Sequence, residues 1–460
     1  MPVNDSMFLL AERREQPMHV GGLQLFHFPP GADERWMADL YESITHCDPG
    51  QISPVFRRRP HRPATSLGAW SWEDDPDVDL EHHLRHSALP RPGRVRELLA
   101  LVSRLHGTLL DRHRPLWEAH LIEGLEGNRF AVYSKIHHSM MDGVSALRLL
   151  AQSLSTDPDA RDLPMPFAVQ PHRRSSSSKE SQSGLAALLD IPVSALKTTY
   201  EVAALGPIVG RAALKAFFDQ NSHLPALGPR TILNQPITGA RRFAAQSWPI
   251  ERVRGVAAAS GTTINDVLLA MCSGALRAYL SELEALPDEP LVAMTPVSLR
   301  QAGMDVGGNA VGAMLCNLAT DLVDPAARLA AVHESMEAGK ATLRGMTPTQ
   351  ATVASAIAMS PMLLGQVPGL RRVASPGYNV VISNIPGPKE ALYWNGAELE
   401  GVYPMSIPTD GQALNITVTS YNGNLEFGLT GCRRTVPHLQ RLLTQLEDSL
   451  AALEKAVVAE

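Results

Sequence analysis

The segment from Phe130 to Leu154 constrains the fold most, because its periodicity changes in the middle. Residues 130–136 (FAVYSKI) are rich in apolar, aromatic and β-branched side chains, which is typical of a buried strand. From Val144 onwards, apolar side chains recur at steps of three and four, which is the period of an amphipathic helix. The sequence therefore predicts a strand that ends in a turn and is followed at once by a helix.

The turn carries the polar heptad HHSMMDG, residues 137–143. Adjacent residues at the end of a strand point to opposite sides, so one histidine can face a cleft while the other needs a partner inside the protein. Asp142 can cap the helix, and Gly143 can adopt a turn conformation that is closed to most other residues. Because ligands usually meet α/β folds at strand ends, we expect a functional site here.

The rest of the first half predicts further strands and helices. Residues 126–128 (EGN) are typical of a hairpin turn, which would pair the motif strand with a strand over residues 115–122. A second histidine pair, His82 and His83, lies among acidic residues and is expected in a solvated polar segment. The other expected elements are a strand over residues 20–28 and helices over residues 34–45 and 95–114, the latter with Leu109 on its apolar face.

The second half also mixes the two kinds of element. Thr263 and Asp266 resemble a capping box, which predicts the start of a long helix. Asn422 and Gly423 are typical of a hairpin turn. Strands are expected over residues 241–248, 291–297, 310–320, 380–382, 414–421 and 425–431, helices over residues 325–344, 349–364 and 437–457, and a rigid loop over residues 383–388.

A region rich in proline and serine separates the halves, and 460 residues exceed one typical domain. The sequence predicts a mixed α/β protein of two domains with the active cleft at their seam. The expected organisation is an N-terminal domain over residues 1–156, a linker or disordered loop over 157–184, a helical connection over 185–240 and a C-terminal domain over 241–460.

Composition argues against several classes of protein. A net charge of -6 gives no basic surplus for nucleic-acid binding. Four dispersed cysteines without a C-x-x-C pair argue against a structural zinc site and a disulfide scaffold. The N-terminus lacks the pattern of a signal peptide, and charges interrupt the longest apolar region, residues 185–218, so it is not expected to span a bilayer. A cytoplasmic location is therefore expected.

Four chemistries could use the heptad. A neutral histidine can serve as a general base for a hydroxyl that attacks an acyl carbon. A Ser-His-Asp triad is disfavoured, because there is no G-x-S-x-G elbow and Ser139 directly follows the histidines. A metal site of His137, His138 and Asp142 is disfavoured, because neighbouring strand residues diverge. A phosphate site would need a glycine-rich loop that is missing. General base catalysis fits best.

The heptad matches the HHxxxDG motif of coenzyme A-dependent acyltransferases, a superfamily that includes chloramphenicol acetyltransferase and peptide-synthetase condensation domains. Further stretches resemble the bacterial wax ester synthase/acyl-CoA:diacylglycerol acyltransferase family more specifically. These are DSMF at residues 5–8, VGG at 20–22, PLW at 115–117, NDV at 265–267 and SNIPGP at 383–388. The resemblance covers nearly the whole chain. It implies two chloramphenicol-acetyltransferase-like domains with the active site in a channel at their interface.

The resemblance also implies an activity: transfer of a long-chain acyl group from acyl-CoA to a fatty alcohol or to diacylglycerol. His138 would act as the general base without an acyl-enzyme, and His137 and Asp142 would support it. Asn265 matches a family position near the site, although a helix cap is an equal interpretation. Arg300 is a candidate partner of Asp142. Trp117, Met359 and Met405 are candidate channel residues.

No permanently bound cofactor and no metal are expected, with acyl-CoA as a co-substrate. The expected partners are a long-chain alcohol or diacylglycerol and a peripheral membrane or lipid-inclusion surface, and the chain would be a monomer or a homodimer. Two alternatives stay open. One is another acyltransferase of the superfamily that acts on a natural-product hydroxyl or amine, and the other is a lipid-binding relative without catalysis.

Overall fold

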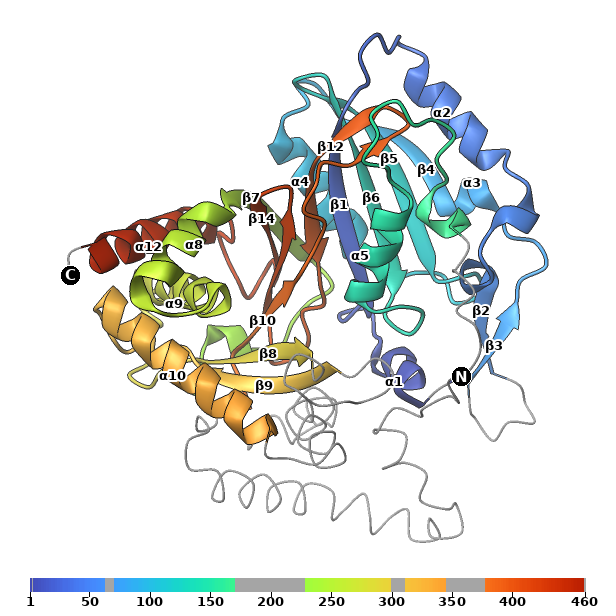
Figure 1. The fold of residues 1–460 in the computed structure, drawn as a ribbon. Helices are drawn as coiled ribbons and strands as arrows, with labels where there is room; N and C mark the ends of the chain where they lie inside the picture. Colours follow the sequence, from blue (N-terminus) through green and yellow to red (C-terminus); the bar gives the residue numbers. More distant parts are fainter. Residues whose placement is uncertain (2, 63–69, 170–227, 299–310, 345–376, 459–460) are drawn as a thin grey trace, which may run out of the picture.

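The chain folds into two halves, each built around a mixed sheet, which meet at a seam near the middle of the molecule (Figure 1). The computed structural model describes residues 1, 3–62, 70–169, 228–298, 311–344 and 377–458. These residues form two six-stranded sheets, one two-stranded sheet and the helices around them. The expected mixed α/β fold with two domains is confirmed, whereas the exact domain boundaries stay a prediction.

The first sheet carries the motif strand, β6, near its centre. The strand order is β11-β12-β1-β6-β5-β4. As the hairpin pattern predicted, β6 pairs antiparallel with β5, and its other edge pairs antiparallel with β1. The strands are β1 (His19–His27), β4 (Leu84–Ala88), β5 (Trp117–Leu125), β6 (Arg129–His137), β11 (Tyr393–Trp394) and β12 (Ala397–Met405); β2 (Arg58–His61) and β3 (Ser71–Asp74) form the small sheet.

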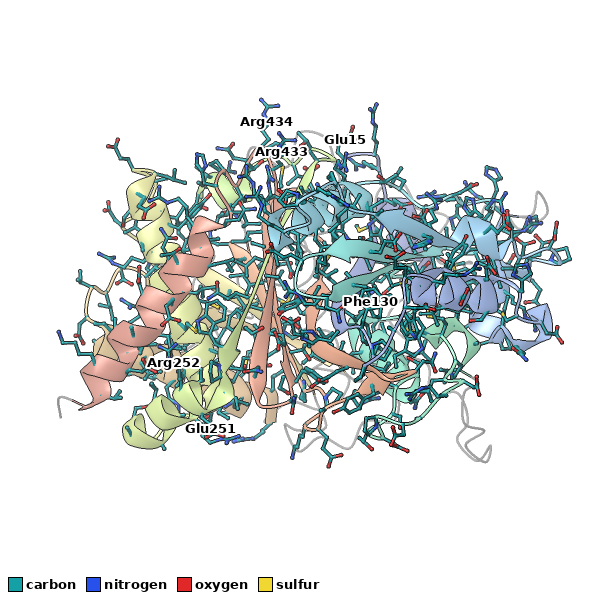
Figure 2. The ribbon with its side chains drawn as sticks, turned by 90° about the horizontal axis from the view of Figure 1, so that it is seen from above. Glu15, Phe130, Glu251, Arg252, Arg433 and Arg434 are labelled. Carbon is teal, nitrogen blue, oxygen red and sulfur yellow. The ribbon has the colours of Figure 1, made fainter. Side chains whose placement is uncertain are left out.

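Both faces of the first sheet are buried, because successive side chains point to opposite faces and apolar ones occur on both. Phe130, labelled in Figure 2, packs in one cluster with Leu147 of α5, whereas Tyr133 packs on the other face with Leu98 of α4. The helices of this half are α1 (Val3–Ala11), α2 (Trp36–Thr45), α3 (Leu80–His83), α4 (Val95–His106) and α5 (Gly143–Gln152), with short 3-10 turns at Pro49–Gln51, Pro54–Arg57 and Pro166–Ala168.

The second sheet has the order β7-β14-β13-β10-β8-β9, and β10 runs parallel to both of its neighbours. Its helices cover the side away from the seam (Figure 1). The strands are β7 (Arg241–Pro249), β8 (Val292–Ser298), β9 (Val311–Asn317), β10 (Val380–Ile385), β13 (Leu414–Tyr421) and β14 (Asn424–Cys432). The helices are α8 (Ile250–Ser260), α9 (Ile264–Glu282), α10 (Pro325–Arg344) and α12 (Arg441–Val458), with a 3-10 turn at Ile232–Asn234.

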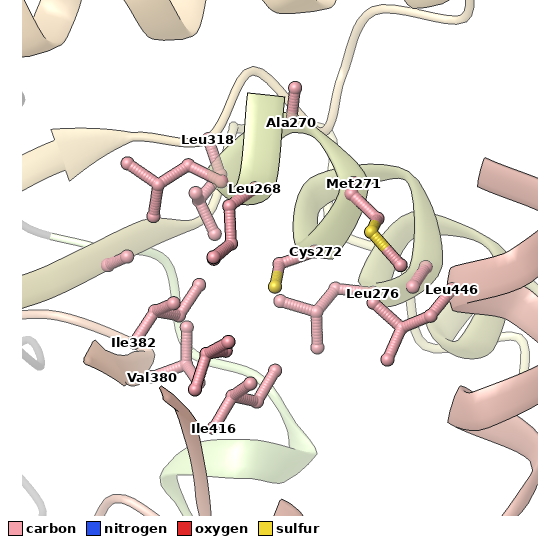
Figure 3. Close-up of a cluster of buried hydrophobic side chains, with 14 of the residues drawn as sticks. Leu268, Ala270, Met271, Cys272, Leu276, Leu318, Val380, Ile382, Ile416 and Leu446 are labelled. Carbon is pink, nitrogen blue, oxygen red and sulfur yellow. The ribbon is translucent and has the colours of Figure 1, made fainter. Parts of the chain in front are cut away.

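Helix α9 is the core helix of the second half. It begins with the predicted capping box, in which the Asp266 N–H donates to Thr263 Oγ1 at 3.2 Å and the Thr263 N–H donates to Asp266 Oδ2 at 3.0 Å. Such a cap stabilises a helix by about 1 kcal/mol. Leu268, Cys272 and Ile382 lie in the same buried cluster, which fixes α9 against β10 (Figure 3).

Strand β12 crosses from the second half into the first sheet, and the sequence did not predict this strand. It pairs antiparallel with β1, where Gly22 lies opposite Pro404. A Cβ at Gly428 of β14 would lie 1.8 Å from the Pro404 carbonyl oxygen. Only glycine therefore allows β14 to approach β12 so closely, and this contact closes the seam.

Further contacts join the halves beside this crossing. The Phe243 N–H of β7 donates to the Ser103 hydroxyl of α4 at 2.9 Å. The Arg241 guanidinium donates to the Glu15 carbonyl at 3.0 Å. Figure 2 shows Glu15 beside Arg433 and Arg434, where the halves meet. The N-terminal segment thus contacts both halves.

Two expected boundaries were wrong. Helix α4 ends at His106 rather than at residue 114, because Gly107 caps it where the chain approaches the Gly239 carbonyl. Leu109, expected on the buried face, is therefore 37% exposed. Strand β10 continues through Ile385, so residues 383–385 form a strand rather than a loop.

The interpretation of His82 and His83 as a solvated segment was wrong for the second of them. His83 is buried, its Nδ1 lies 2.8 Å from the Trp117 carbonyl oxygen, and its ring stacks on the Trp117 indole with centroids 4.5 Å apart. Burial holds the pKa of His83 down at about 4. It is a neutral packing residue of the first half.

Several expectations lie outside the described residues, namely most of the helical connection over residues 185–240, the helix over residues 349–364 and most of the Pro/Ser linker. Within the described residues, no single helix is long and apolar enough to cross a bilayer. Helices α8 and α9 together have the length and composition of a membrane span, but they are bent by 104° relative to each other. Their apolar side chains lie in the core of the second half.

Candidate active site

The heptad folds as the sequence predicted, with a turn between β6 and α5. His137 is the last residue of β6, where it lies opposite His19 of β1. Asp142 is the N-cap of α5, and its carboxylate accepts the Ser145 N–H at 2.7 Å. The predicted capping role of Asp142 is therefore confirmed.

Gly143 does not adopt the left-handed turn conformation that we expected. It is the first residue of α5, and its φ is not positive. A Cβ at this position would lie 3.7 Å from Cδ1 of Ile385, an ordinary contact. The expectation was wrong because Asp142 begins the helix one residue earlier. Gly143 instead marks where the motif touches β10 of the second half.

His137 is fully buried and faces the interior. Its Nδ1 accepts the Ser139 N–H at 3.1 Å, and the Ser139 hydroxyl lies 2.6 Å from the same nitrogen. An Nδ1 that accepts a hydrogen bond carries no hydrogen, so the hydrogen of the neutral ring lies on Nε2. This nitrogen is 3.4 Å from Glu12 Oε1. Ser139 therefore holds one side of the ring, and the Glu12 carboxylate lies near the other.

Glu12 is a site residue that the sequence analysis missed. Its side chain is 2% exposed, and Oε2 accepts the Arg112 Nε and Nη2 hydrogens at 3.0 Å and 2.9 Å. Burial alone would raise the pKa of Glu12, but His137 and Arg112 outweigh it and lower that pKa. The group beside His137 is thus a carboxylate at neutral pH. The only sequence signal was its proximity to the DSMF stretch at residues 5–8.

His138 differs from His137 because its side chain is only partly buried. Its N–H donates to the Met18 carbonyl at 2.8 Å, which ties the turn to the segment before β1. Its imidazole stacks on the Phe8 ring of α1, with centroids 4.2 Å apart and planes 14° apart. Burial lowers the pKa of His138, although Asp142 acts in the opposite direction. The ring is therefore neutral at pH 7, so one of its nitrogens carries a lone pair.

Asn265 lies in the first turn of α9, but it is not the cap, because Thr263 has that role. Its Oδ1 is 3.5 Å from Nδ2 of Asn384 on β10. The next residue on β10, Ile385, is the one that approaches Gly143. The carboxyl end of β10 thus lies between the heptad of the first half and Asn265 of the second. The structure brings these predicted site residues to one seam.

A buried ion pair connects the motif strand β6 with its neighbour β5. Lys135 is fully buried, and its Nζ lies 3.1 Å from Glu118 Oε2 of β5 and donates to the Thr108 carbonyl at 2.9 Å. Burial alone would raise the pKa of Glu118, but the neighbouring His120, Lys135 and Arg85 lower it to about 2. Burial also lowers the pKa of Lys135, against the effect of Glu118. The pair is therefore ionised but costly to desolvate.

The candidate channel residues are packed or undescribed. Trp117 is 3% exposed, packs between His83 and Phe167, and donates its indole N–H to the Phe56 carbonyl at 3.0 Å. Met405 is 1% exposed in the cluster beneath α4. Both residues are core packing, and the assignment of a channel to them stays a prediction. Arg300 and Met359 lie outside the described residues.

The geometry does not favour the metal site of His137, His138 and Asp142. Within the described parts of the chain, no three His, Cys, Asp or Glu side chains form a group that could hold a metal ion. His137 already has Ser139 and Glu12 as neighbours, and Asp142 caps α5, so these side chains are committed elsewhere. The same residues fit proton transfer better.

Comparison with known proteins agrees with this geometry. The wax ester synthase/diacylglycerol acyltransferase catalytic domain matches residues 1–268, and the C-terminal domain of the same family matches residues 307–454. A putative diacylglycerol O-acyltransferase of Mycobacterium tuberculosis is 51% identical over 453 residues, which are 98% of this chain and 99% of that protein. A probable diacylglycerol O-acyltransferase of the same species is 48% identical, over 99% of both chains.

Solved structures show the same relationship. The wax ester synthase/diacylglycerol acyltransferase from Marinobacter aquaeolei is 42% identical, covers 100% of both chains and superposes with a TM-score of 0.79. The first condensation domain of the CDA synthetase shares the fold at 17% identity, with a TM-score of 0.58 over 99% of this chain and 95% of that one. The chain therefore belongs to the wax ester synthase/diacylglycerol acyltransferase family.

Proposed function

We propose that this protein transfers a long-chain acyl group from acyl-CoA to the hydroxyl of a fatty alcohol or of diacylglycerol, which gives a wax ester or a triacylglycerol. Family membership supports the reaction class, and the names of the mycobacterial relatives support diacylglycerol as an acceptor. The observation that carries the proposal is the partly exposed, neutral imidazole of His138 in an intact heptad at the seam.

His138 is the general base in this mechanism. A hydrogen bond between the ring and its own backbone acts on its pKa. Such a bond uses Nδ1, the ring nitrogen nearest the main chain, and leaves Nε2 as the base. Nε2 takes the proton of the acceptor hydroxyl while the oxygen attacks the thioester carbonyl carbon. The tetrahedral intermediate then expels the coenzyme A thiolate, which receives that proton, so no acyl-enzyme forms.

General base catalysis is sufficient for this reaction because a thioester is already an activated acyl donor. The barrier lies in the weakly acidic hydroxyl, and removing its proton during attack accelerates the reaction on the order of a hundred- to ten-thousandfold. Holding both substrates in one seam adds a proximity effect. Asp142 holds the turn that carries the base, and Asn265 orients the reacting groups from the opposite half.

The working environment is part of the proposal. Because both substrates are poorly soluble, the protein works from the cytoplasm at a membrane or lipid-inclusion surface, as a monomer or a homodimer. It needs acyl-CoA as a co-substrate and no permanently bound cofactor. Flotation with liposomes, with and without anionic lipid, tests the surface, and a protein that stays at the bottom of both gradients contradicts it.

One assay tests the proposed reaction. Purified protein receives palmitoyl-CoA with hexadecanol, with dipalmitoylglycerol, or with water alone, and thiol release and lipid products are followed together. We expect an ester product in at least one acceptor arm and little thiol release in water. Thiol release that does not depend on the acceptor would show a hydrolase. No turnover in any arm would favour a natural-product acceptor or a lipid-binding protein.

A further inference from the structure

The N-terminal helix α1 and Glu12, the residue that follows it, together contact both histidines of the heptad, although more than a hundred residues separate them in sequence. Phe8 reaches His138, and Glu12 reaches His137. These two residues are four positions apart, and the Glu12 N–H donates to the Phe8 carbonyl at 3.0 Å. This bond continues the helical pattern just past Ala11, so Glu12 lies one turn after Phe8 and on the same side of the chain.

The contact of Phe8 with His138 fixes the plane of the imidazole. The rings are nearly parallel, with 14° between their planes and 4.2 Å between their centroids. Without such a contact, a histidine side chain can rotate about χ2, and this rotation changes the direction in which its basic nitrogen points. Stacking on one face limits this rotation, and the stack itself does not involve the ring edge, which carries the lone pair.

The contact of Glu12 with His137 fixes the neighbouring ring and the backbone between them. Glu12 Oε1 lies 3.4 Å from His137 Nε2 and also accepts the Met18 N–H at 3.3 Å. The Met18 carbonyl in turn accepts the His138 N–H at 2.8 Å. One carboxylate thus connects α1 to both residues of the histidine pair.

The helix itself is held in place independently of these contacts. Leu9 is 1% exposed and packs in a cluster with Leu110 and Leu116, against which Met140 of the heptad also packs. Arg112 donates to the Leu9 carbonyl at 2.7 Å as well as to Glu12. Leu10, in contrast, is 61% exposed. Docking of α1 and positioning of the histidines are therefore separable by mutation.

We propose that α1 and the residue that follows it form a positioning element of the active site, in which Phe8 orients the imidazole of His138 by stacking and Glu12 orients that of His137 through its carboxylate. This inference rests on the proposed role of His138 as the base. Neither residue touches the reacting atoms. Loss of either contact therefore lowers the fraction of enzyme in which the base is aligned and leaves substrate binding intact.

The stack is tested with Phe8→Leu, which keeps an apolar side chain, and Phe8→Tyr, which restores an aromatic ring. We expect Phe8→Leu to lower kcat roughly three- to tenfold with KM for palmitoyl-CoA unchanged, since one aromatic stack has about that effect on an equilibrium. Phe8→Tyr should recover most of kcat. Leu10→Ala, on the same helix but exposed, is the matched control and should behave as wild type.

The pH profile separates positioning from a general loss of structure. The titratable neighbours that act on His138 are Asp142 and His137, whereas α1 contributes the apolar Phe8 ring. Phe8→Leu admits water to the imidazole, so the acidic limb of kcat/KM should move to higher pH. Leu9→Ala loosens α1 without removing either contact, and it should lower the melting temperature without moving that limb.

Glu12 is tested by comparing Glu12→Gln with Glu12→Ala. Glutamine keeps an oxygen that can lie near His137 Nε2, so it should retain most of kcat, whereas alanine should lose roughly tenfold. Equal loss in both variants, or a wild-type kcat and pH profile in Phe8→Leu, would overturn the inference. His138→Ala is assayed beside them. If that variant stays active, the proposed base is wrong; if it is inactive while Phe8→Leu is unaffected, only the role of α1 is wrong.

Discussion

Replacing Lys135 by methionine should destabilise the protein strongly, because the residue lies on the motif strand away from solvent, in a buried ion pair. Lys135 is fully buried, pairs with Glu118 at 3.1 Å and donates to the Leu105 and Thr108 carbonyls at 3.3 Å and 2.9 Å. Methionine fills a similar volume but leaves the Glu118 carboxylate, 9% exposed, without its closest counterion. Removing one partner of such a pair costs about 3–5 kcal/mol.

The pKa of Glu118 gives the pH dependence of this stabilisation. A change from 4.5 in the unfolded chain to about 2 in the folded one corresponds to roughly 3 kcal/mol, which is shared among His120, Lys135 and Arg85. Because the folded pKa is depressed, this stability is present above pH 4.5 and is lost as the pH falls towards 2. The difference in unfolding free energy between wild type and Lys135→Met should therefore narrow as the pH is lowered below about 4.5.

Urea unfolding followed by circular dichroism measures the effect. The matched control is the double variant Lys135→Met/Glu118→Leu, which removes both charges and should recover at least half of the loss, because burying the pair is itself costly. A loss below about 1 kcal/mol in Lys135→Met, or a double variant less stable than the single one, would refute the reasoning.

Three further predictions concern the seam. Asp142→Ala removes the cap of α5 and should cost about 1 kcal/mol of unfolding free energy together with most of the activity; an unchanged melting temperature would contradict its structural role. Asn265→Ala should lower kcat while the melting temperature stays near that of wild type. Thr263→Ala should lower the melting temperature and leave kcat unchanged. The reverse pattern in kinetics and thermal melts would assign the capping role to Asn265. Burial lowers the pKa of His138, and the base acts when it is deprotonated, so kcat/KM should rise with pH and reach its plateau below pH 6.5. An acidic limb with its midpoint above pH 6.5 would exclude this imidazole as the base.

The heptad and its flanking elements could be predicted because local signals agreed there. The strand period ends at His137 and the helical period begins after a capping aspartate, so the turn between them has little freedom. The capping box at Thr263 is equally local, and it was found as expected. The conformation of Gly143 was predicted wrongly, because the presence of a glycine does not show whether its φ is positive.

Contacts between distant segments could not be predicted. Strand β12 contains Pro404, which argues against a strand inside a sheet, and its partner β1 lies far away in sequence. Glu12 looks like any charged residue near a chain terminus, and only the fold places it against His137. His83 among acidic residues read as exposed, because its partner Trp117 is supplied by tertiary structure.

The proposed mechanism requires the imidazole at position 138 to remove the proton of the acceptor hydroxyl. Initial rates of ester formation from palmitoyl-CoA in His138→Ala measure this directly, beside His82→Ala as a partly exposed histidine on α3. We expect a loss of roughly a hundredfold or more in His138→Ala with an unchanged melting temperature, and wild-type rates in His82→Ala. Ester formation near the wild-type rate in a folded His138→Ala protein would contradict it.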